Sequence, residues 1–129
     1  MNKSGCTPLY DAIFWGHKEL VPLLLNAGAE PNKAESAGKT PLHYAIEYGK
    51  KDVVQLLLDR GANPNTLSNS GCTPLYNAIF WGHKDMVPLL LNAGAEPNKA
   101  GNLGQTPLHL AKERGLMGTV KILYDALKH

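Results

Sequence analysis

The side chains best suited to covalent or metal chemistry in this sequence are two cysteines and five histidines. Cys6 and Cys72 occupy equivalent positions of a duplicated segment, and the sequence offers neither of them a basic partner that would activate the thiol. His17 and His83 each follow a glycine, with no second ligand at a metal-site spacing. Phosphate-binding, G-x-S-x-G and H-E-x-x-H motifs are absent. The sequence therefore predicts no catalytic residue, no metal site and no cofactor.

The aromatic residues indicate a different chemistry, which is recognition. The segment AIFWGH occurs at residues 12–17 and again at residues 78–83, and these two copies contain every Phe and Trp of the chain. Large apolar rings usually lie in a core. However, a helix that turns Ala12 and Ile13 inward places Phe14 and Trp15 on another face. Rings displayed in this way are typical of binding hot spots.

The elements that must position these rings follow from a repeat with a period of 33 residues. Four glycines begin G-x-T-P-L phrases: Gly5, Gly38, Gly71 and Gly104. In the first unit, Thr7 is placed to cap a helix that begins at Pro8 and ends near Gly16. A second helix carries the leucines of residues 20–25. No unit can bury its leucine face alone, so the units must stack. We predict units at about residues 5–37, 38–70, 71–103 and 104–129.

These phrases resemble ankyrin repeats. The resemblance depends on TPLH in units two and four, TPLY in units one and three, and the LLL-x-x-GA-x-P-N tail, and it covers residues 5–129. It implies an all-α fold, a solenoid of four stacked helix–turn–helix units with β-turn fingers, in one domain over residues 1–129. It also implies a non-enzymatic scaffold that binds another protein through its concave groove and finger tips.

In such an arrangement one face of each first helix lines the groove. We predict that a partner contacts the two aromatic pairs, the matching positions of the other units, and the residue after the first glycine of two fingers. The candidate partner-binding residues are Asp11, Phe14, Trp15, Lys39, Tyr44, Glu47, Tyr48, Asn77, Phe80, Trp81, Gln105, Glu113 and Arg114. The acidic side chains beside the rings favour a partner with apolar anchors and some positive charge.

Several alternatives stay open. Phe14 and Phe80 could wedge between neighbouring first helices, so that only the indole rings are exposed. No polar cap precedes Gly5, so the chain could self-associate through its first unit, or it could be the binding domain of a larger protein whose activity lies elsewhere. Residues 5–34 and 71–100 differ at only three positions (11/77, 19/85 and 20/86), which indicates a recent duplication.

Charge and composition narrow the partner and the compartment. The formal charge of +2, from 13 basic and 11 acidic residues, is too evenly spread for a nucleic-acid surface, and no apolar run is long enough for a membrane span. Cys6 and Cys72 lie too far apart in a stack to form a disulfide, so we predict free thiols. Together with the lack of a signal peptide, this favours a cytoplasmic protein, or one in a host cytosol if the source is an intracellular bacterium.

The resemblance also implies structural roles. His43 and His109 match a histidine that hydrogen-bonds the finger loops between repeats, and Tyr10 and Tyr76 take its place in units one and three. Asn32, Asn65 and Asn98 match residues that stabilise the finger by local hydrogen bonds. Such residues are hydroxylated in some family members, and the preceding prolines leave this modification open here.

Two departures from the repeat pattern lead to predictions about the second helices and about the C-terminal unit. Pro22 and Pro88 fall in the first turn of a second helix, where we expect a mild bend with the ring on the outer face. Unit four lacks the GA-x-P-N tail, and its added basic residues are those expected of a solvated C-terminal cap: Lys112, Arg114, Lys121 and Lys128.

Overall fold

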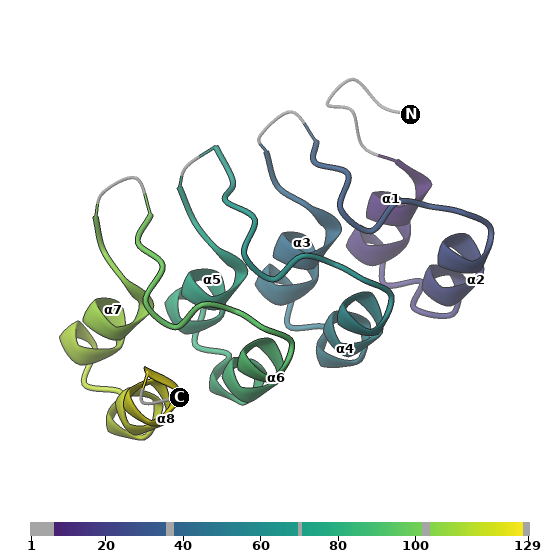
Figure 1. The fold of residues 1–129 in the computed structure, drawn as a ribbon. Helices are drawn as coiled ribbons and strands as arrows, with labels where there is room; N and C mark the ends of the chain where they lie inside the picture. The colour runs from purple at the N-terminus through teal and green to yellow at the C-terminus, as the bar shows by residue number, and fades with distance from the viewer. Residues whose placement is uncertain (1–6, 36–37, 70, 102–103, 128–129) are drawn as a thin grey trace.

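The computed structural model describes residues 7–35, 38–69, 71–101 and 104–127, and it shows helix pairs standing side by side (Figure 1). The first helices form one row: α1 (Pro8–Phe14), α3 (Pro41–Glu47), α5 (Pro74–Phe80) and α7 (Pro107–Glu113). The second helices form the other row: α2 (Leu20–Asn26), α4 (Lys51–Asp59), α6 (Val87–Asn92) and α8 (Met117–Leu127). A 3-10 turn, η1 (Lys84–Met86), precedes α6. These ranges contain no strand, and the predicted all-α solenoid is confirmed.

Each first helix begins as the Thr-Pro pair predicts. The hydroxyls of Thr40, Thr73 and Thr106 accept a hydrogen bond from the backbone N–H three residues later, which satisfies one of the free donors of the helix start. Thr7 has the extended backbone of a cap residue, but its hydroxyl accepts no such bond, so capping by that side chain is not observed. Gly16 ends the first segment with a φ of 78°, which a residue with a side chain rarely adopts.

The two prolines accompany second helices that begin later than in unit two, and the expected bend stays a prediction. In α4, which has no proline, the helix begins at Lys51, whereas α2 begins two positions later in its unit and α6 three positions later. Proline disfavours helical backbone at the residue before it and cannot donate a hydrogen bond. In unit three the first residues of the second helix therefore form the 3-10 turn η1 instead. Pro88 is exposed, as expected, and Pro22 is half-buried.

The core lies between the two rows of helices. Ala12, Ala45, Ala78 and Ala111 are buried at one position of the first helices, and their small side chains let neighbouring helices approach closely. Leucine, isoleucine and valine from both rows fill the remaining space. None of the described helices has both the length and the apolar character needed to cross a bilayer.

Backbone hydrogen bonds cross the base of three fingers at matching places. The amides of Glu35, Ser68 and Gly101 donate to the carbonyls of Lys39, Cys72 and Gln105, respectively. Residues 36–37, 70 and 102–103 lie outside the described residues, so the predicted β-turns stay a prediction. Cys6 and Lys128 also lie outside the described ranges, and Cys72 is not part of a disulfide among the described residues.

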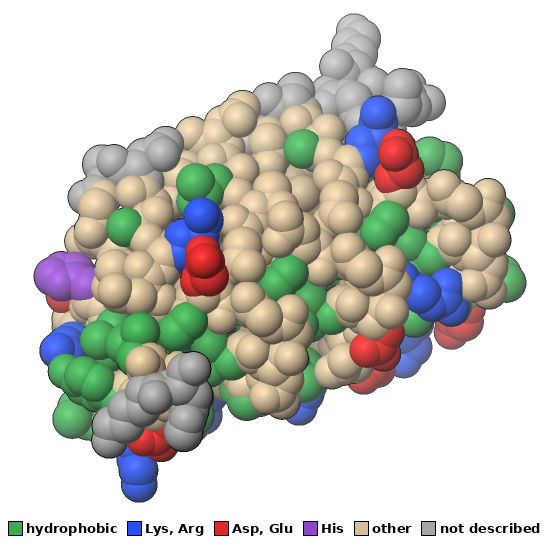
Figure 2. All heavy atoms as spheres, viewed as in Figure 1, with side chains coloured by type: hydrophobic (Ala, Val, Ile, Leu, Met, Phe, Trp, Pro, Cys, Tyr) green, Lys and Arg blue, Asp and Glu red, His purple; other side chains and the backbone are tan. Residues whose placement is uncertain are grey.

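The C-terminal pair is less polar on its surface than a solvated cap would be. Lys112, Arg114 and Lys121 are exposed as expected, but α8 also exposes Met117 and Tyr124. In the space-filling view, hydrophobic side chains gather over the lower left of the molecule, where α7 and α8 lie (Figure 2).

Candidate functional site

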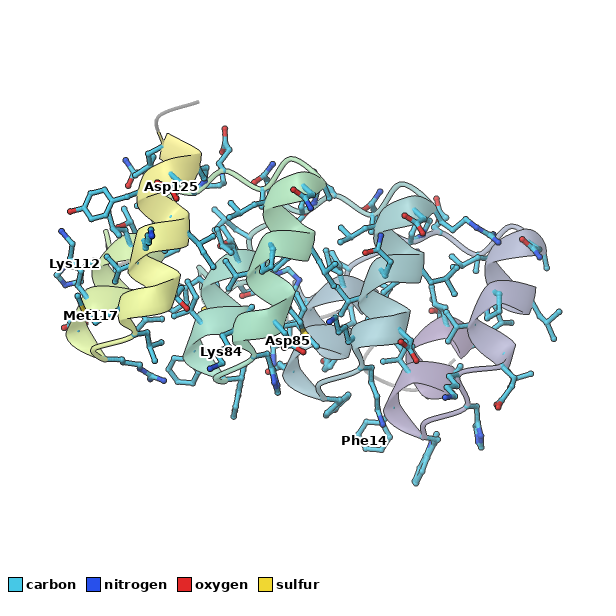
Figure 3. The ribbon with its side chains drawn as sticks, turned by 90° about the horizontal axis from the view of Figure 1, so that it is seen from below. Phe14, Lys84, Asp85, Lys112, Met117 and Asp125 are labelled. Carbon is cyan, nitrogen blue, oxygen red and sulfur yellow. The ribbon has the colours of Figure 1, made fainter. Side chains whose placement is uncertain are left out.

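Six aromatic side chains project from the first helices and their last turns, and we call this set the aromatic row: Phe14, Trp15, Tyr44, Tyr48, Phe80 and Trp81. The indole rings are accessible, since Trp15 is 68% exposed and Trp81 is 50% exposed. Phe14, Tyr48 and Phe80 are also exposed, and Tyr44 is half-buried. In the stick view Phe14 points away from the helices, at the edge where α1 ends (Figure 3). The alternative in which both phenyl rings are wedged between helices is therefore not what the structure shows.

The N-terminal part of the aromatic row is held by ring-to-ring contacts. Phe14 meets Trp15 and Tyr48 edge to face, with centroid distances of 5.0 and 5.7 Å. Tyr48 stacks on Tyr44 at 6.0 Å, and Tyr44 in turn meets the ring of Tyr10 at 5.2 Å. Such pairs favour one arrangement of the rings over others. The rings are consequently preorganised although they are exposed.

The C-terminal part of the row contains a cation of the chain itself. Phe80 meets Trp81 edge to face at 5.3 Å and stacks on Tyr76 at 6.4 Å. The guanidinium carbon of Arg114 lies 4.7 Å from the centre of the Phe80 ring, and one of its N–H groups donates to the Phe80 carbonyl at 2.6 Å. Phe80 therefore interacts with a guanidinium through both its ring and its backbone.

In units two and four, a predicted binding residue of the finger pairs with a predicted acidic residue of the first helix. The ammonium of Lys39 lies 2.9 Å from a carboxylate oxygen of Glu47 and 5.2 Å from the centre of the Tyr44 ring. In unit four, the Gln105 amide reaches the Glu113 carboxylate at 3.5 Å. The Lys39 ammonium therefore already neutralises the charge of the Glu47 carboxylate. This pairing argues against the prediction that Glu47 attracts a positively charged partner.

One position of the first helix differs strongly between units. Asp11 is exposed on α1, whereas the matching Asn77 on α5 is only 5% exposed and cannot offer a contact surface. Leu110, the match in α7, is buried as well. The reason is position in the stack, because α3 packs before α5 and α5 packs before α7, whereas no described helix packs before α1. Asn77 should therefore be removed from the predicted binding surface.

The predicted link between repeats is present at His43. Its ring Nδ1 accepts the Thr40 backbone N–H at 3.0 Å, and Nε2 donates to the Cys72 carbonyl of the next finger at 3.0 Å. Burial lowers the pKa of His43, which favours this neutral form, although the hydrogen bond to Cys72 and the charge of Glu47 oppose the shift. His43 thus holds the finger of the following unit in place.

The equivalents of His43 behave differently in the other units. The hydroxyl of Tyr10 lies against the backbone carbonyls of Lys33 and Lys39, so it reaches the next finger as predicted. Tyr76 also reaches the next finger, but its hydroxyl donates there to the side-chain oxygen of Gln105 at 2.8 Å. His109 is exposed, and its Nε2 lies 3.7 Å from the Glu113 carboxylate rather than on a finger.

The loop asparagines hold neighbouring units together, which the sequence did not reveal. The amide of Asn32 donates to the Gly61 carbonyl at 3.0 Å and accepts the Asn63 N–H at 2.6 Å. Asn65 repeats this pattern with the Gly94 carbonyl and the Glu96 N–H, at 3.1 and 2.8 Å. The expected bonds were local to one finger, but these cross between units. Each asparagine lies about one repeat before its hydrogen-bond partners in the sequence. This spacing was the signal from which bonds between units could have been predicted.

Metal-ligating side chains do not gather at one place in the part of the chain that the structure describes. Within the described ranges, no three His, Cys, Asp or Glu side chains cluster in a way that could hold a metal ion. What the aromatic row presents to a partner is exposed apolar area.

Comparison with known protein families agrees with this architecture. The model described as "Ankyrin repeats (3 copies)" matches residues 30–101, more than half of the chain, and the model described as "Ankyrin repeat" matches residues 4–35. No curated protein matches the chain. Repeats of this family are generally modules for protein–protein interaction, and the family is typically non-enzymatic. With its helix pairs, helix-ending glycines and matching repeat models, the chain belongs to the ankyrin repeat family.

Proposed function

We propose that this chain is a non-enzymatic scaffold that binds a partner protein through the aromatic row and the adjacent finger tips. The observation that carries the proposal is the exposure of both indole rings on a rigid set of helices. Tryptophan and tyrosine bury a large area on binding while few rotatable bonds are frozen. Because the rings already pack against each other, little ordering is needed when the partner arrives.

The aromatic row fits binding better than folding. Single exposed apolar residues are common on soluble proteins, but a continuous exposed patch usually marks an interaction site. The core is supplied by other residues, since the aliphatic side chains between the helix rows are buried. Lys39 and Gln105 lie on the fingers beside the row and would contact the rim of a partner. We propose that this binding takes place in the cytoplasm, where cysteines such as Cys72 stay outside disulfides.

The test is a double substitution, Trp15→Ala with Trp81→Ala. We expect capture of a partner protein from a cell extract to fall by more than about 30-fold in affinity, since hot-spot truncations cost about 2 kcal/mol or more. The midpoint of thermal unfolding should change little, because both rings are largely exposed. Affinity is measured by surface plasmon resonance with the captured protein, and stability by circular dichroism.

A matched control is available on the opposite row of helices. Leu23→Ala also removes an exposed apolar side chain, but from α2, away from the aromatic row. It should leave capture unchanged. If the double tryptophan variant instead loses much of its folding stability, the rings are part of the packing and the proposed surface is wrong.

Self-association is a second candidate function, favoured by one observation. Leu20 and Leu23 on α2 are exposed, whereas of the matching residues in unit three Met86 is buried and Leu89 is half-buried. A second copy of the chain could cover this face. Sedimentation at increasing protein concentration separates the two functions, because a strict monomer at high concentration removes self-association and leaves partner binding intact.

A further inference from the structure

The near-identity of units one and three allows a comparison within the molecule. Both units carry the same Phe-Trp pair, at Phe14-Trp15 and at Phe80-Trp81, and both phenylalanines end their helix. In each case the residue that reaches the ring from the following unit lies 34 positions later in the chain. For Phe80 this residue is Arg114, and for Phe14 it is Tyr48. The two sites therefore differ mainly in what the next unit supplies.

At the second site, the chain shows which chemical group the Phe-Trp pair accepts. The Arg114 guanidinium covers the Phe80 ring at 4.7 Å and donates to the Phe80 carbonyl at 2.6 Å. Both interactions suit a planar cation, since the plane can lie over a ring while its N–H groups point to an acceptor at the edge. The carbonyl is available because the last residues of a helix have no N–H partner within the helix.

At the first site, the same groups are present without a cation from the described parts of the chain. Phe14 is 57% exposed, compared with 42% for Phe80, and Trp15 is also more exposed than Trp81. Phe14 ends α1 just as Phe80 ends α5, so its carbonyl likewise has no N–H partner within the helix. The ring of Phe14 stands nearly perpendicular to both of its aromatic neighbours, at 79° to Trp15 and 83° to Tyr48.

One difference in charge favours a cation at the first site, although the ammonium of Lys50 lies close to Gly16, beside this site. Of the three differences between units one and three, one replaces Asn77 by Asp11, which lies one helical turn before Phe14 and Trp15. Asp11 is exposed, and no basic residue among the described ones forms an ion pair with it. A carboxylate at this place attracts a positively charged group toward the rings.

We propose that Phe14, Trp15 and the Phe14 carbonyl form a binding site for an arginine side chain of a partner protein. This inference rests on the proposed function, because it specifies the chemistry of the partner at one end of the aromatic row. Arg114 on Phe80 is the internal counterpart of that bound arginine. The site favours a guanidinium over an ammonium, because only the guanidinium can lie flat on the ring and donate to the carbonyl at once.

Two peptides test the proposal directly. One is the acetylated amide Ala-Leu-Arg-Leu-Ala, and the other has citrulline, a neutral isostere, in place of arginine. Binding is followed by NMR at the indole N–H signals, assigned to Trp15 and Trp81 with single Trp→Phe variants. We expect the arginine peptide to shift the Trp15 signal and to bind about five-fold more tightly than the citrulline peptide, which corresponds to an exposed cation–π contact. The Trp81 signal should respond less.

Exchanging the two natural residues provides matched variants. In Tyr48→Arg the chain supplies its own guanidinium to Phe14, and peptide binding at Trp15 should fall by about five-fold. In Arg114→Tyr the second pair loses its internal guanidinium, and Trp81 should respond to the arginine peptide as Trp15 does. Asp11→Asn, which installs the residue of unit three, should weaken binding by about two-fold, and less so at high salt. Circular dichroism confirms that each variant is folded.

The outcomes separate this inference from the proposed function. Equal binding of both peptides, no response of Trp15 to the arginine peptide, or an unchanged response in Tyr48→Arg would each overturn the arginine site. In that case a partner protein whose capture still depends on Trp15 and Trp81 leaves the proposed function standing. Conversely, arginine binding at Trp15 without any tryptophan-dependent partner in cell extracts supports the site and contradicts the scaffold function.

Discussion

Replacing Met86 with alanine is expected to lower the free energy of unfolding by about 3 kcal/mol. Met86 is only 1% exposed, where η1 joins α6, and truncation of a buried methionine removes apolar contacts and leaves a cavity. The loss should appear in urea unfolding followed by circular dichroism. Because stacked units support one another, the effect is expected on the transition of the whole domain.

Leu20→Ala is the matched control, since Leu20 holds the same position in the nearly identical unit one. Leu20 is 45% exposed, so its truncation should cost about 1 kcal/mol or less. Equal losses for the two variants would contradict the stack, because they would mean that units one and three have the same neighbours. A larger loss for Leu20→Ala would show that its face is covered in solution, which would support self-association.

Replacing His43 with alanine is expected to cost about 3 kcal/mol of folding stability. The change leaves the Thr40 N–H without the Nδ1 acceptor and the Cys72 carbonyl without the Nε2 donor, and both groups lie in partly or fully buried surroundings. It also leaves a cavity where the ring was fully buried. His43→Tyr is the matched variant, because tyrosine stands at this position in units one and three and reaches the next finger in unit one. It should retain much of the stability.

The lowered pKa of His43 predicts a pH dependence with a definite sign. Burial is the main cause of the lowered pKa, so at pH values just below 6.5 the unfolded chain binds a proton at this residue that the folded chain does not. The stability contributed by the neutral ring is fully present above about pH 6.5, and it is lost as the pH falls toward the folded pKa. The slope from this residue is at most about 1.4 kcal/mol per pH unit.

Urea unfolding of the wild type and of His43→Tyr over this pH range isolates the contribution. The wild type should lose stability relative to the variant as the pH falls below about 6.5. A stability difference that stays constant with pH would contradict the neutral, buried histidine. The other described histidines remain in both proteins and cancel in the comparison.

The helices and the stack could be predicted from the sequence because they depend on local chemistry and on periodicity. Thr-Pro pairs mark where first helices begin, and glycines with positive φ end them. The leucines at helical spacing are too numerous for one helix pair to cover, so the units have to stack. Exposure of Trp15 followed from the same reasoning, since Ala12 and Ile13 had to occupy the buried side of α1.

The surroundings of each candidate residue could not be predicted in this way, because they depend on the neighbouring units. Asp11 and Asn77 belong to nearly identical segments, yet one is exposed and the other is buried, because α3 packs before α5 whereas no described helix packs before α1. Likewise, the guanidinium of Arg114 lies over the Phe80 ring, whereas Phe14 meets the ring of Tyr48. The helices of Phe80 and Phe14 nevertheless have the same aromatic sequence. A repeat in the sequence determines what each unit looks like alone. Contacts between units, which come from residues about one repeat away, determine which of its side chains remain free to bind.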